Sequence, residues 1–463
     1  MRFPSRAGLR AVVIAAALTV ESNAQTPPST DAVQRLEQRL DAMERKHQQE
    51  LEARDREIDR LRQRIDGSAT PAAPGAILNE VDAVGPATPA AGAGGAGTGA
   101  SDAVARDAAL RRGASFSPDI AVVVDALGSY SSNRSNDAYN RFDVREAELD
   151  LRAPIHPIAD GVVIFAFERD VENPVFPDPA EPAEGPEGSV AIEEAYVFLH
   201  DFGVPNLTAK LGRFHVRFGR QNMLHLHDLP TSDPPLVNQA FLSPESLADA
   251  GLSLSYVVPP RLVGNQYVEL IGEVLSGEGA ASESPTLRGD VTVDSPAVNL
   301  HALWNRDLSP QWNFELGGSF LHGNASADNG QDVNLYGVDV TLMRRGQAGR
   351  FNGQLLQAEA IYGDTHDEDG IQRHSWGAYL LGQQQLSREL YAGLRLDYTQ
   401  NPNARDEEAW GLSPYVSWYL SEFLRFRLQY QFRDGDVPEE HNVFVQATYI
   451  FGAHPPHPYW SMR

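Results

Sequence analysis

Between residues 115 and 453 the hydrophobic pattern repeats every second residue, and this feature limits the possible folds most. In 422–433 the even positions from Leu424 to Phe432 are apolar, and the odd positions from Arg425 to Arg433 are arginine or glutamine. A period of two is typical of a β-strand, whose side chains alternate between two faces. The repeating segments exceed the roughly 5–6 residues of an average soluble strand. The pattern therefore favours long strands with one apolar and one charged face.

Long strands of this kind are the signature of a transmembrane β-barrel with an apolar exterior and a polar lumen. About sixteen candidate strands follow one another between residues 117 and 453, and the fifth spans 206–218. Tight turns alternate with longer polar loops, as in barrels with short periplasmic turns. We therefore predict an all-β transmembrane barrel of about 16 antiparallel strands over 114–453, wide enough for an aqueous channel.

The N-terminal residues have the organisation of an export signal. Arg2, Arg6 and Arg10 precede or flank an apolar stretch at 11–20, and small residues follow it up to Ala24. We predict a signal peptide at 1–24. Together with the barrel pattern, it predicts a location in the bacterial outer membrane.

Three further segments are distinct in composition. Residues 25–66 carry apolar positions mostly three or four apart, which predicts an N-terminal α-helical coiled coil in the periplasm. Residues 67–113 form an Ala/Gly/Pro-rich linker, and 454–463 form a His/Pro-rich tail. A coiled coil needs partner helices, so we expect a homotrimer held by the coiled coil and the barrel.

Composition excludes several classes of function. The chain has no cysteine, which excludes disulfides and thiolate metal sites. Its formal charge of −25 argues against nucleic acid as a partner. No G-x-S-x-G motif or other nucleophile–base pair is present, so we expect no enzyme, no catalytic residue and no resident cofactor.

Charged residues on the polar faces of the strands are the candidate pore lining. An acidic row on the second and third strands would oppose basic rows on the fifth and fifteenth, and this field would orient polar solutes. A salt-bridge ladder that braces the wall is the alternative. The predicted pore-lining residues are Glu146, Glu148, Asp150, Arg152, Glu168, Arg213, His215, Arg217, Arg425 and Arg427.

The stretch LHLHDLP (224–230) is a candidate metal site. His225 and His227 point the same way in an extended chain, and Asp228 follows at once. Zinc takes three or four nitrogen and oxygen ligands, which His215 or Asp233 could complete. His366, in the acidic stretch DTHDEDG (364–370), is a second candidate. Hydrogen-bonded loop anchors are the alternative for the pair, and a solvated acidic surface for His366.

The connection 219–248 would be the third external loop, and it is too long and too apolar to lie in water. By strand number and loop order, 115–453 resembles the trimeric sixteen-stranded porins, whose third loop folds into the barrel and narrows it. The coiled coil is similar to that of some trimeric and phosphate-selective porins. The resemblance implies a constriction loop that contains His225, His227 and Asp228.

A narrower resemblance rests on two stretches. LHLHDLPTSDPPLVNQAFLSPESLADAGLSLSYVVP (224–259) and FGAHPPHPY (451–459) resemble an outer-membrane group labelled zinc-regulated TonB-dependent receptors. TonB-dependent receptors have about 22 strands and a plug, which this chain has no segment to supply. The resemblance therefore implies a porin-like channel, with Zn²⁺ as a candidate transported ion.

These observations predict an outer-membrane channel that passes small hydrophilic solutes or ions, with divalent metal such as zinc among the candidates. Its partners would be outer-membrane lipid and two further copies of the chain. A TonB-type metal or substrate receptor and a structural outer-membrane tether are the alternatives.

Overall fold

The structure is a computed structural model and describes residues 118–134, 140–169, 175–176, 188–200, 202–277, 284–287, 296–324, 332–346, 351–366 and 370–452. The predicted signal peptide (1–24), coiled coil (25–66), linker (67–113) and tail (454–463) lie outside the described residues. Within the described ranges, no helix is long and apolar enough to cross a bilayer.

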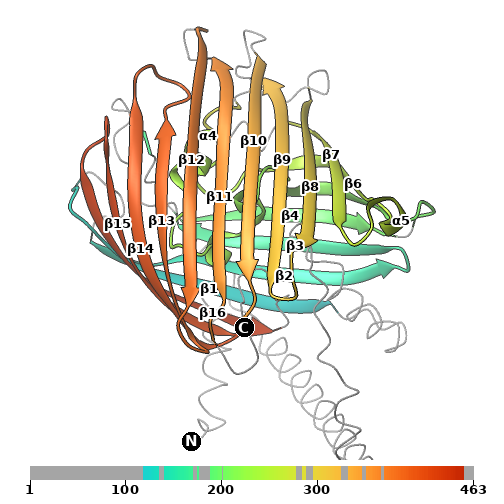
Figure 1. Ribbon diagram of the computed structural model, residues 1–463, viewed down its shortest axis with the longest axis horizontal. Helices are drawn as coiled ribbons and strands as arrows, with labels where there is room; N and C mark the ends of the chain where they lie inside the picture. The colour runs from blue at the N-terminus through green and yellow to red at the C-terminus, as the bar shows by residue number, and fades with distance from the viewer. Residues whose placement is uncertain are drawn as a thin grey trace, which may run out of the picture. The chain divides into compact units, whose positions relative to one another are not determined.

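The described residues form one closed barrel of sixteen antiparallel strands (Figure 1), which confirms the predicted number. The barrel closes where β1 pairs with β16, from Ala121 opposite Gly452 to Ser131 opposite Asn442. In chain order the strands are β1 (Asp119–Ser131), β2 (Arg141–His156), β3 (Ala159–Arg169), β4 (Gly188–Leu199), β5 (Leu207–His215), β6 (Ala248–Val257), β7 (Tyr267–Leu275), β8 (Ala297–Asp307), β9 (Trp312–Asn324), β10 (Asp332–Arg344), β11 (Gln354–His366), β12 (Gln372–Gln385), β13 (Leu390–Gln400), β14 (Glu408–Ser421), β15 (Leu424–Gly435) and β16 (Glu440–Gly452).

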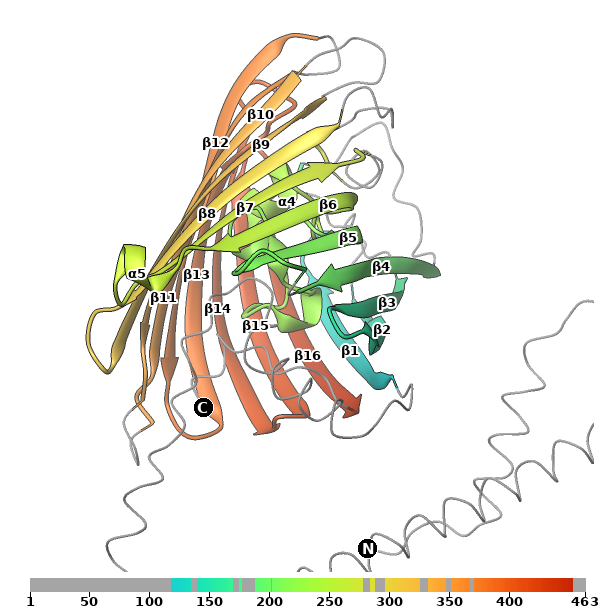
Figure 2. The ribbon, with the colours of Figure 1, turned by 90° about the vertical axis from the view of Figure 1, so that its right-hand side faces the viewer.

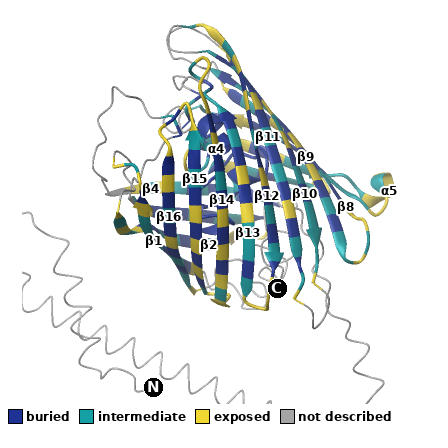
Figure 3. Ribbon diagram, turned by 60° about the vertical axis from the view of Figure 1, so that its left-hand side comes forward, coloured by how far each residue is buried: buried dark blue, intermediate teal, exposed yellow. Residues whose placement is uncertain are grey.

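The barrel wall buries one face of each strand and exposes the other (Figure 3). On β15, Leu428 is 56% exposed, whereas its neighbour Gln429 is fully buried. Leu428 lies in register with Val416 of β14 and Val445 of β16, which are also exposed. A continuous apolar outer surface of this kind requires lipid around it. The period-two pattern therefore encodes a transmembrane barrel whose inner face carries most of the polar side chains of the wall.

Connections at the two ends of the barrel differ in length, although less regularly than predicted. At one end, β2 and β3 are joined through residues 157–158, and β6 and β7 through 258–266, which contain the short helix α5 (Pro260–Val263). The longest connections, at the other end, are 170–187, 216–247 and 276–296. The prediction that every connection at this end is long is wrong for 436–439, which is no longer than the opposite turn 386–389.

The connection between β5 and β6 lies inside the barrel (Figure 2). It contains two short 3₁₀ turns, η1 (Gln221–Met223) and η2 (Leu226–Asp228), and one helix, α4 (Leu236–Phe241), which lies against β11–β14. β5 ends at His215, not at residue 218 as predicted, because the chain turns inward there. We call residues 216–247 the inserted loop.

The apolar core of the molecule lies between the inserted loop and the inner wall of β9–β12. Phe218 and Phe241 of the loop are fully buried in it, together with Leu335 and Leu381 of the wall. The wall leaves room for these rings with glycine. A Cβ on Gly337 would lie 2.7 Å from the Phe218 ring, and one on Gly363 would lie 2.8 Å from the Phe241 ring. The aromatic rings of the loop therefore fit into spaces that glycines leave on this side of the barrel wall.

Candidate functional site

The two ends of the inserted loop are joined by a backbone hydrogen bond from the Val216 N–H to the Leu247 carbonyl oxygen (2.9 Å) and by the side chain of Asn222. Asn222 donates through Nδ2 to the carbonyl oxygens of Val216 (2.7 Å) and Leu247 (2.9 Å). Its Oδ1 accepts a hydrogen bond from the Leu247 backbone N–H at 2.7 Å. Buried backbone groups need such partners, and Asn222 supplies three bonds at once. The loop therefore has a defined base.

Arginines on β15 hold the loop through its main chain. Arg427 donates to the carbonyl oxygens of Thr231 (2.6 Å) and Leu229 (2.7 Å), and Arg425 donates to that of His227. Arg425 and Arg427 were predicted to line the pore. Both are buried on the inner face of the wall, and they donate to the loop and to wall side chains such as Thr448 and Gln446, which is not the salt-bridge ladder of the alternative.

A second pair of arginines extends this contact. Arg395 of β13 donates to Asp233 Oδ2 at 2.8 Å and to Asp397 Oδ2 at 2.7 Å. Arg145 of β2 donates to the carbonyl of Ser232 and to Asp125, both at 2.5 Å. Asp233, a candidate metal ligand in the sequence, is therefore an ion-pair partner of Arg395.

A carboxylate of the wall holds other parts of the loop, at residues 220–221 and 238. Glu359 Oε2 of β11 accepts hydrogen bonds from the backbone N–H groups of Arg220 (3.2 Å) and Gln221 (3.3 Å). Its Oε1 accepts one from Asn238 Nδ2 at 3.2 Å. Gly219, with φ of 59°, leaves no room for a side chain beside this carboxylate. The wall thus offers donors to the loop's carbonyls and an acceptor to its amides.

The predicted pair His225 and His227 lies against an acidic wall. His225 Nδ1 is 2.8 Å from Glu193 Oε1 and 3.3 Å from Glu148 Oε1. His227 Nδ1 is 2.9 Å from Glu148 Oε1 and 3.4 Å from Glu146 Oε2. Both imidazoles are buried, with 7% and 1% of their surface exposed.

Further groups surround the two rings. Asp228 Oδ2 lies 3.4 Å from His227 Nε2 on the far side of that ring. The predicted His215, at the end of β5, places its ring centroid 4.6 Å from that of His225, and its Nε2 is 3.7 Å from Glu193 Oε1. We call His215, His225, His227, Glu146, Glu148 and Glu193 the histidine–glutamate cluster.

Charge in the cluster changes the protonation of the loop histidines. Burial opposes the charged form of His225, but the carboxylates of Glu193 and Glu148 outweigh it and raise its pKa well above the usual value. Burial acts in the same direction on His227, and Asp228 and Glu148 reverse it, so the pKa of His227 is also raised well above the usual value.

Two β-bulges shape the wall beside these histidines, and the alternation of the sequence predicted neither. On β2 the register with β1 shifts so that Arg145 is extra, and Arg145 and Glu146 are both buried. On β4 the register with β3 shifts at Glu193, and both Glu193 and Glu194 reach His225. A bulge adds a residue to one strand and re-aims its side chains. The adjacent glutamates of IEEA (192–195) are the only sequence signal for the second bulge.

The other predicted pore residues have varied surroundings. Asp150 is buried and accepts a hydrogen bond from Arg152 at 2.9 Å, and Glu168 is half-buried on β3. Arg217 lies just after β5, and its backbone N–H donates to Glu273 at 2.9 Å.

Two further predicted residues, Arg213 and His366, are not members of the cluster. Arg213 is half-buried and lies opposite Ala195 in the β4–β5 register, while Lys210 reaches the Tyr196 ring at 4.6 Å. His366 ends β11, and its Nδ1 is 3.0 Å from the Asp332 carbonyl oxygen, away from the histidine–glutamate cluster. Residues 367–369 of its acidic stretch lie outside the described residues.

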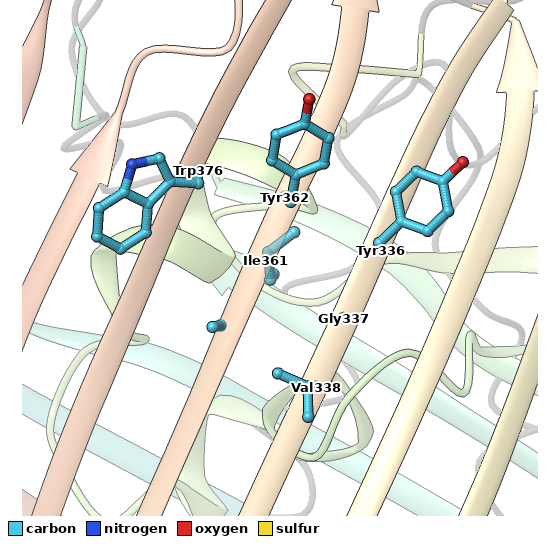
Figure 4. A pocket seen from close by; sticks show the side chains of 7 residues that line it. Tyr336, Gly337, Val338, Ile361, Tyr362 and Trp376 are labelled. Carbon is cyan, nitrogen blue, oxygen red and sulfur yellow. The ribbon is translucent and has the colours of Figure 1, made fainter.

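A shallow hollow on the outer wall has no comparable chemistry. Tyr336, Tyr362 and Trp376 border it (Figure 4), and all three are more than two-fifths exposed on the apolar exterior. The hollow faces lipid, so the inserted loop and its contacts remain the candidate functional site.

A closed sixteen-strand barrel with an apolar exterior and an inserted third loop defines a porin-like outer-membrane β-barrel. No protein-family model matches the chain. An uncharacterized protein of Aquifex aeolicus (strain VF5) is 26% identical over 354 residues, which cover 69% of this chain and 70% of that protein.

Several solved structures are similar to the chain. Pseudomonas putida OprB has a TM-score of 0.49 at 12% identity, with 75% of this chain and 96% of that chain covered. An anion-selective porin from Comamonas acidovorans has a TM-score of 0.49 at 12% identity, with 73% of this chain and 100% of that chain covered. The outer membrane channel DcaP of Acinetobacter baumannii has a TM-score of 0.47 at 13% identity, with 73% of this chain and 98% of that chain covered.

Proposed function

We propose that this protein is a passive outer-membrane channel for small hydrophilic solutes, narrowed by the inserted loop. One observation carries the proposal: residues 216–247 lie inside a closed sixteen-strand barrel, and side chains of the wall hold them there. A barrel of about sixteen strands leaves an aqueous interior, so the loop decides its width. The mechanism needs no catalytic residue and no resident cofactor.

Charge on the wall has two roles in this proposal. Arg395, Arg425 and Arg427 fix the loop's position, and we expect the remaining polar side chains of the inner wall to contact the solute. Polar and charged groups in a narrow pore set the preference among solutes. We expect substitution of these three arginines to change the conductance more than substitution of exposed side chains on the loop does.

The alternatives have less support. A TonB-type receptor would have about 22 strands around a plug, whereas this barrel closes with sixteen. A tether needs only the barrel as an anchor, and so does not account for a loop held inside it by Arg395, Arg425 and Arg427.

Two further expectations belong to the proposal. We expect a homotrimer, as in the porins that the sequence resembles. Divalent metal such as zinc remains a candidate solute, but the burial of His225 and His227 favours an ion that stays bound over one that passes.

Planar-bilayer recording of the purified full chain tests the channel. We expect discrete conductance steps, and larger steps when residues 224–240 are replaced by a short Gly/Ser linker. Absence of ion current from the folded wild-type protein would overturn the channel. Equal steps from the wild type and the loop replacement would overturn the role of the loop.

A further inference from the structure

The histidine–glutamate cluster contains two groups of potential metal ligands. In the first, Glu193, His215 and His225 place one ligand atom each within 4.8 Å of one another. In the second, Glu146, Glu148 and His227 do the same. The two groups are neighbours, because the ring centroids of His225 and His227 are 5.5 Å apart.

The separations of the ligand atoms suit zinc. Zinc binds nitrogen and carboxylate oxygen at roughly 2.0–2.2 Å, so two ligands of one tetrahedral ion lie roughly 3.3–3.6 Å apart. His215 Nε2 and Glu193 Oε1 are 3.7 Å apart, and His227 Nδ1 and Glu146 Oε2 are 3.4 Å apart. The shorter His225–Glu193 contact of 2.8 Å needs to open by well under 1 Å. Imidazole with carboxylate is a donor set that zinc and similar divalent transition metals accept.

Two buried carboxylate oxygens of the cluster could each bind a cation. Glu146 Oε2 and Glu193 Oε2 are buried, and neither accepts a hydrogen bond of acceptable geometry from the described residues. One oxygen each of Glu146, Glu168 and Glu193 lies within 4.8 Å of the others. Like charges at this distance in a buried setting repel strongly, and a divalent cation between them would remove the repulsion.

The backbone is shaped to bring these groups together. The bulge on β4 turns Glu193 toward the lumen beside Glu194, and the bulge on β2 sets Glu146 beside Arg145. Such bulges occur next to functional sites, where they re-aim side chains. Asp228 lies at 3.4 Å from His227 Nε2, on the ring edge opposite the second group, where it would orient the imidazole as outer partners of metal ligands do.

We propose that the cluster binds two divalent transition-metal cations of the zinc class. One is held by Glu193, His215 and His225, and the other by Glu146, Glu148 and His227. The ions clamp the inserted loop to β2, β4 and β5. Binding at this site does not depend on whether the barrel conducts.

Zinc content of the full chain tests the proposal. The folded protein is treated with EDTA, incubated with ZnCl₂ and gel-filtered, and zinc per chain is then measured. We expect about two ions per chain, and about one each in His225→Gln and in His227→Gln, because each change removes one ligand group. The double variant should hold none. His301→Gln is the matched control, because His301 is also buried but contacts Ser319, not the cluster.

Two additions keep the test decisive. X-ray absorption at the zinc edge of the wild type should show only nitrogen and oxygen ligands, near 2.0–2.2 Å. Glu193→Gln, which preserves shape, should lower the zinc content to about one ion per chain if a histidine variant does not fold. Heat-modifiable gel mobility reports folding.

The opposite results would overturn the proposal. Zinc content below two per chain in the wild type, or unchanged in the folded double variant or in Glu193→Gln, means that the cluster is an ion-paired anchor only. A zinc-free protein that still conducts would leave the channel intact, so the two proposals fail separately.

Discussion

Nη2 of Arg427 on β15 donates a hydrogen bond to the carbonyl oxygen of Leu229 in the inserted loop at 2.7 Å. Nη1 of the same guanidinium donates to the Thr231 carbonyl at 2.6 Å. Arg427 is 2% exposed, and its two acceptors belong to buried residues. The wall therefore holds the loop by its main chain at this point.

Replacing Arg427 should loosen the loop. Arg427→Met keeps most of the side-chain volume but removes the donors to Leu229 and Thr231. Because buried carbonyls left without a donor cost about 1–3 kcal/mol each, we expect the free energy of unfolding to fall by about 3 kcal/mol. Single-channel recording should show larger and noisier steps. Arg405→Met, at an exposed loop position, is the control, and equal traces from the two variants would contradict the anchor.

Filling the glycine space at Gly363 should displace helix α4. In Gly363→Ala the new Cβ would lie 2.8 Å from the Phe241 ring, so the ring and the helix must move. We expect a loss of about 1–3 kcal/mol in unfolding free energy and a changed conductance. Gly382→Ala is the control, because its Cβ would meet nothing within 4 Å. Urea unfolding of the two variants measures the difference, and rescue by Phe241→Ala would tie the loss to this contact.

Asn222→Ala should open the base of the inserted loop. The change removes three hydrogen bonds to Val216 and Leu247 and takes the side-chain acceptor away from the buried Leu247 backbone N–H. We expect a loss of about 2–4 kcal/mol and faster cleavage of the loop by protease in the folded barrel. Gln239→Ala, which removes a single bond to the Pro234 carbonyl, should have a small effect. Similar cleavage rates for both would show that Asn222 does not close the loop.

The outer surface of β14 and β15 should tolerate charge only near the ends of the strands. Leu428 lies near the middle of β15 with apolar neighbours, and Leu420 lies near the end of β14. Leu428→Arg should cost about 2–4 kcal/mol on folding into lipid vesicles, and Leu420→Arg about 0–1 kcal/mol. Equal costs at the two positions would place the lipid boundary elsewhere on the wall.

The sequence predicts the barrel well because its signal is repeated. Each strand alternates independently, so an error at one boundary, such as the end of β5 at His215, leaves the count of sixteen intact. The length of a connection is a weaker guide to the end of the barrel at which it lies. The short loop 436–439 shows that a turn can be tight at either end, because hairpin length follows local turn residues.

The site is predicted only in part, because it depends on departures from the pattern. LHLHDLP identified His225, His227 and Asp228, and the alternation placed Glu146 and Glu148 in the lumen. Glu193 was missed, since a bulge changes the facing of one residue without changing the composition around it.

Contacts between residues far apart in the chain could not be predicted from the sequence either. The contact of Arg395 with Asp233 joins residues far apart in the chain, and nothing in their local patterns pairs them. Gly337 and Gly363 are likewise ordinary strand glycines until the rings of Phe218 and Phe241 are in place.

The anchors of the inserted loop have a consequence for how such a channel can change. Arg145, Arg395, Arg425 and Arg427 all donate to carbonyl oxygens of residues 227–233. Every amino acid carries a carbonyl, so most substitutions in this segment keep the same attachment points. Substitutions in this segment can therefore change the side chains that a solute would meet while the hydrogen bonds to the wall stay the same. Solute preference could then change by single substitutions without any change in the barrel.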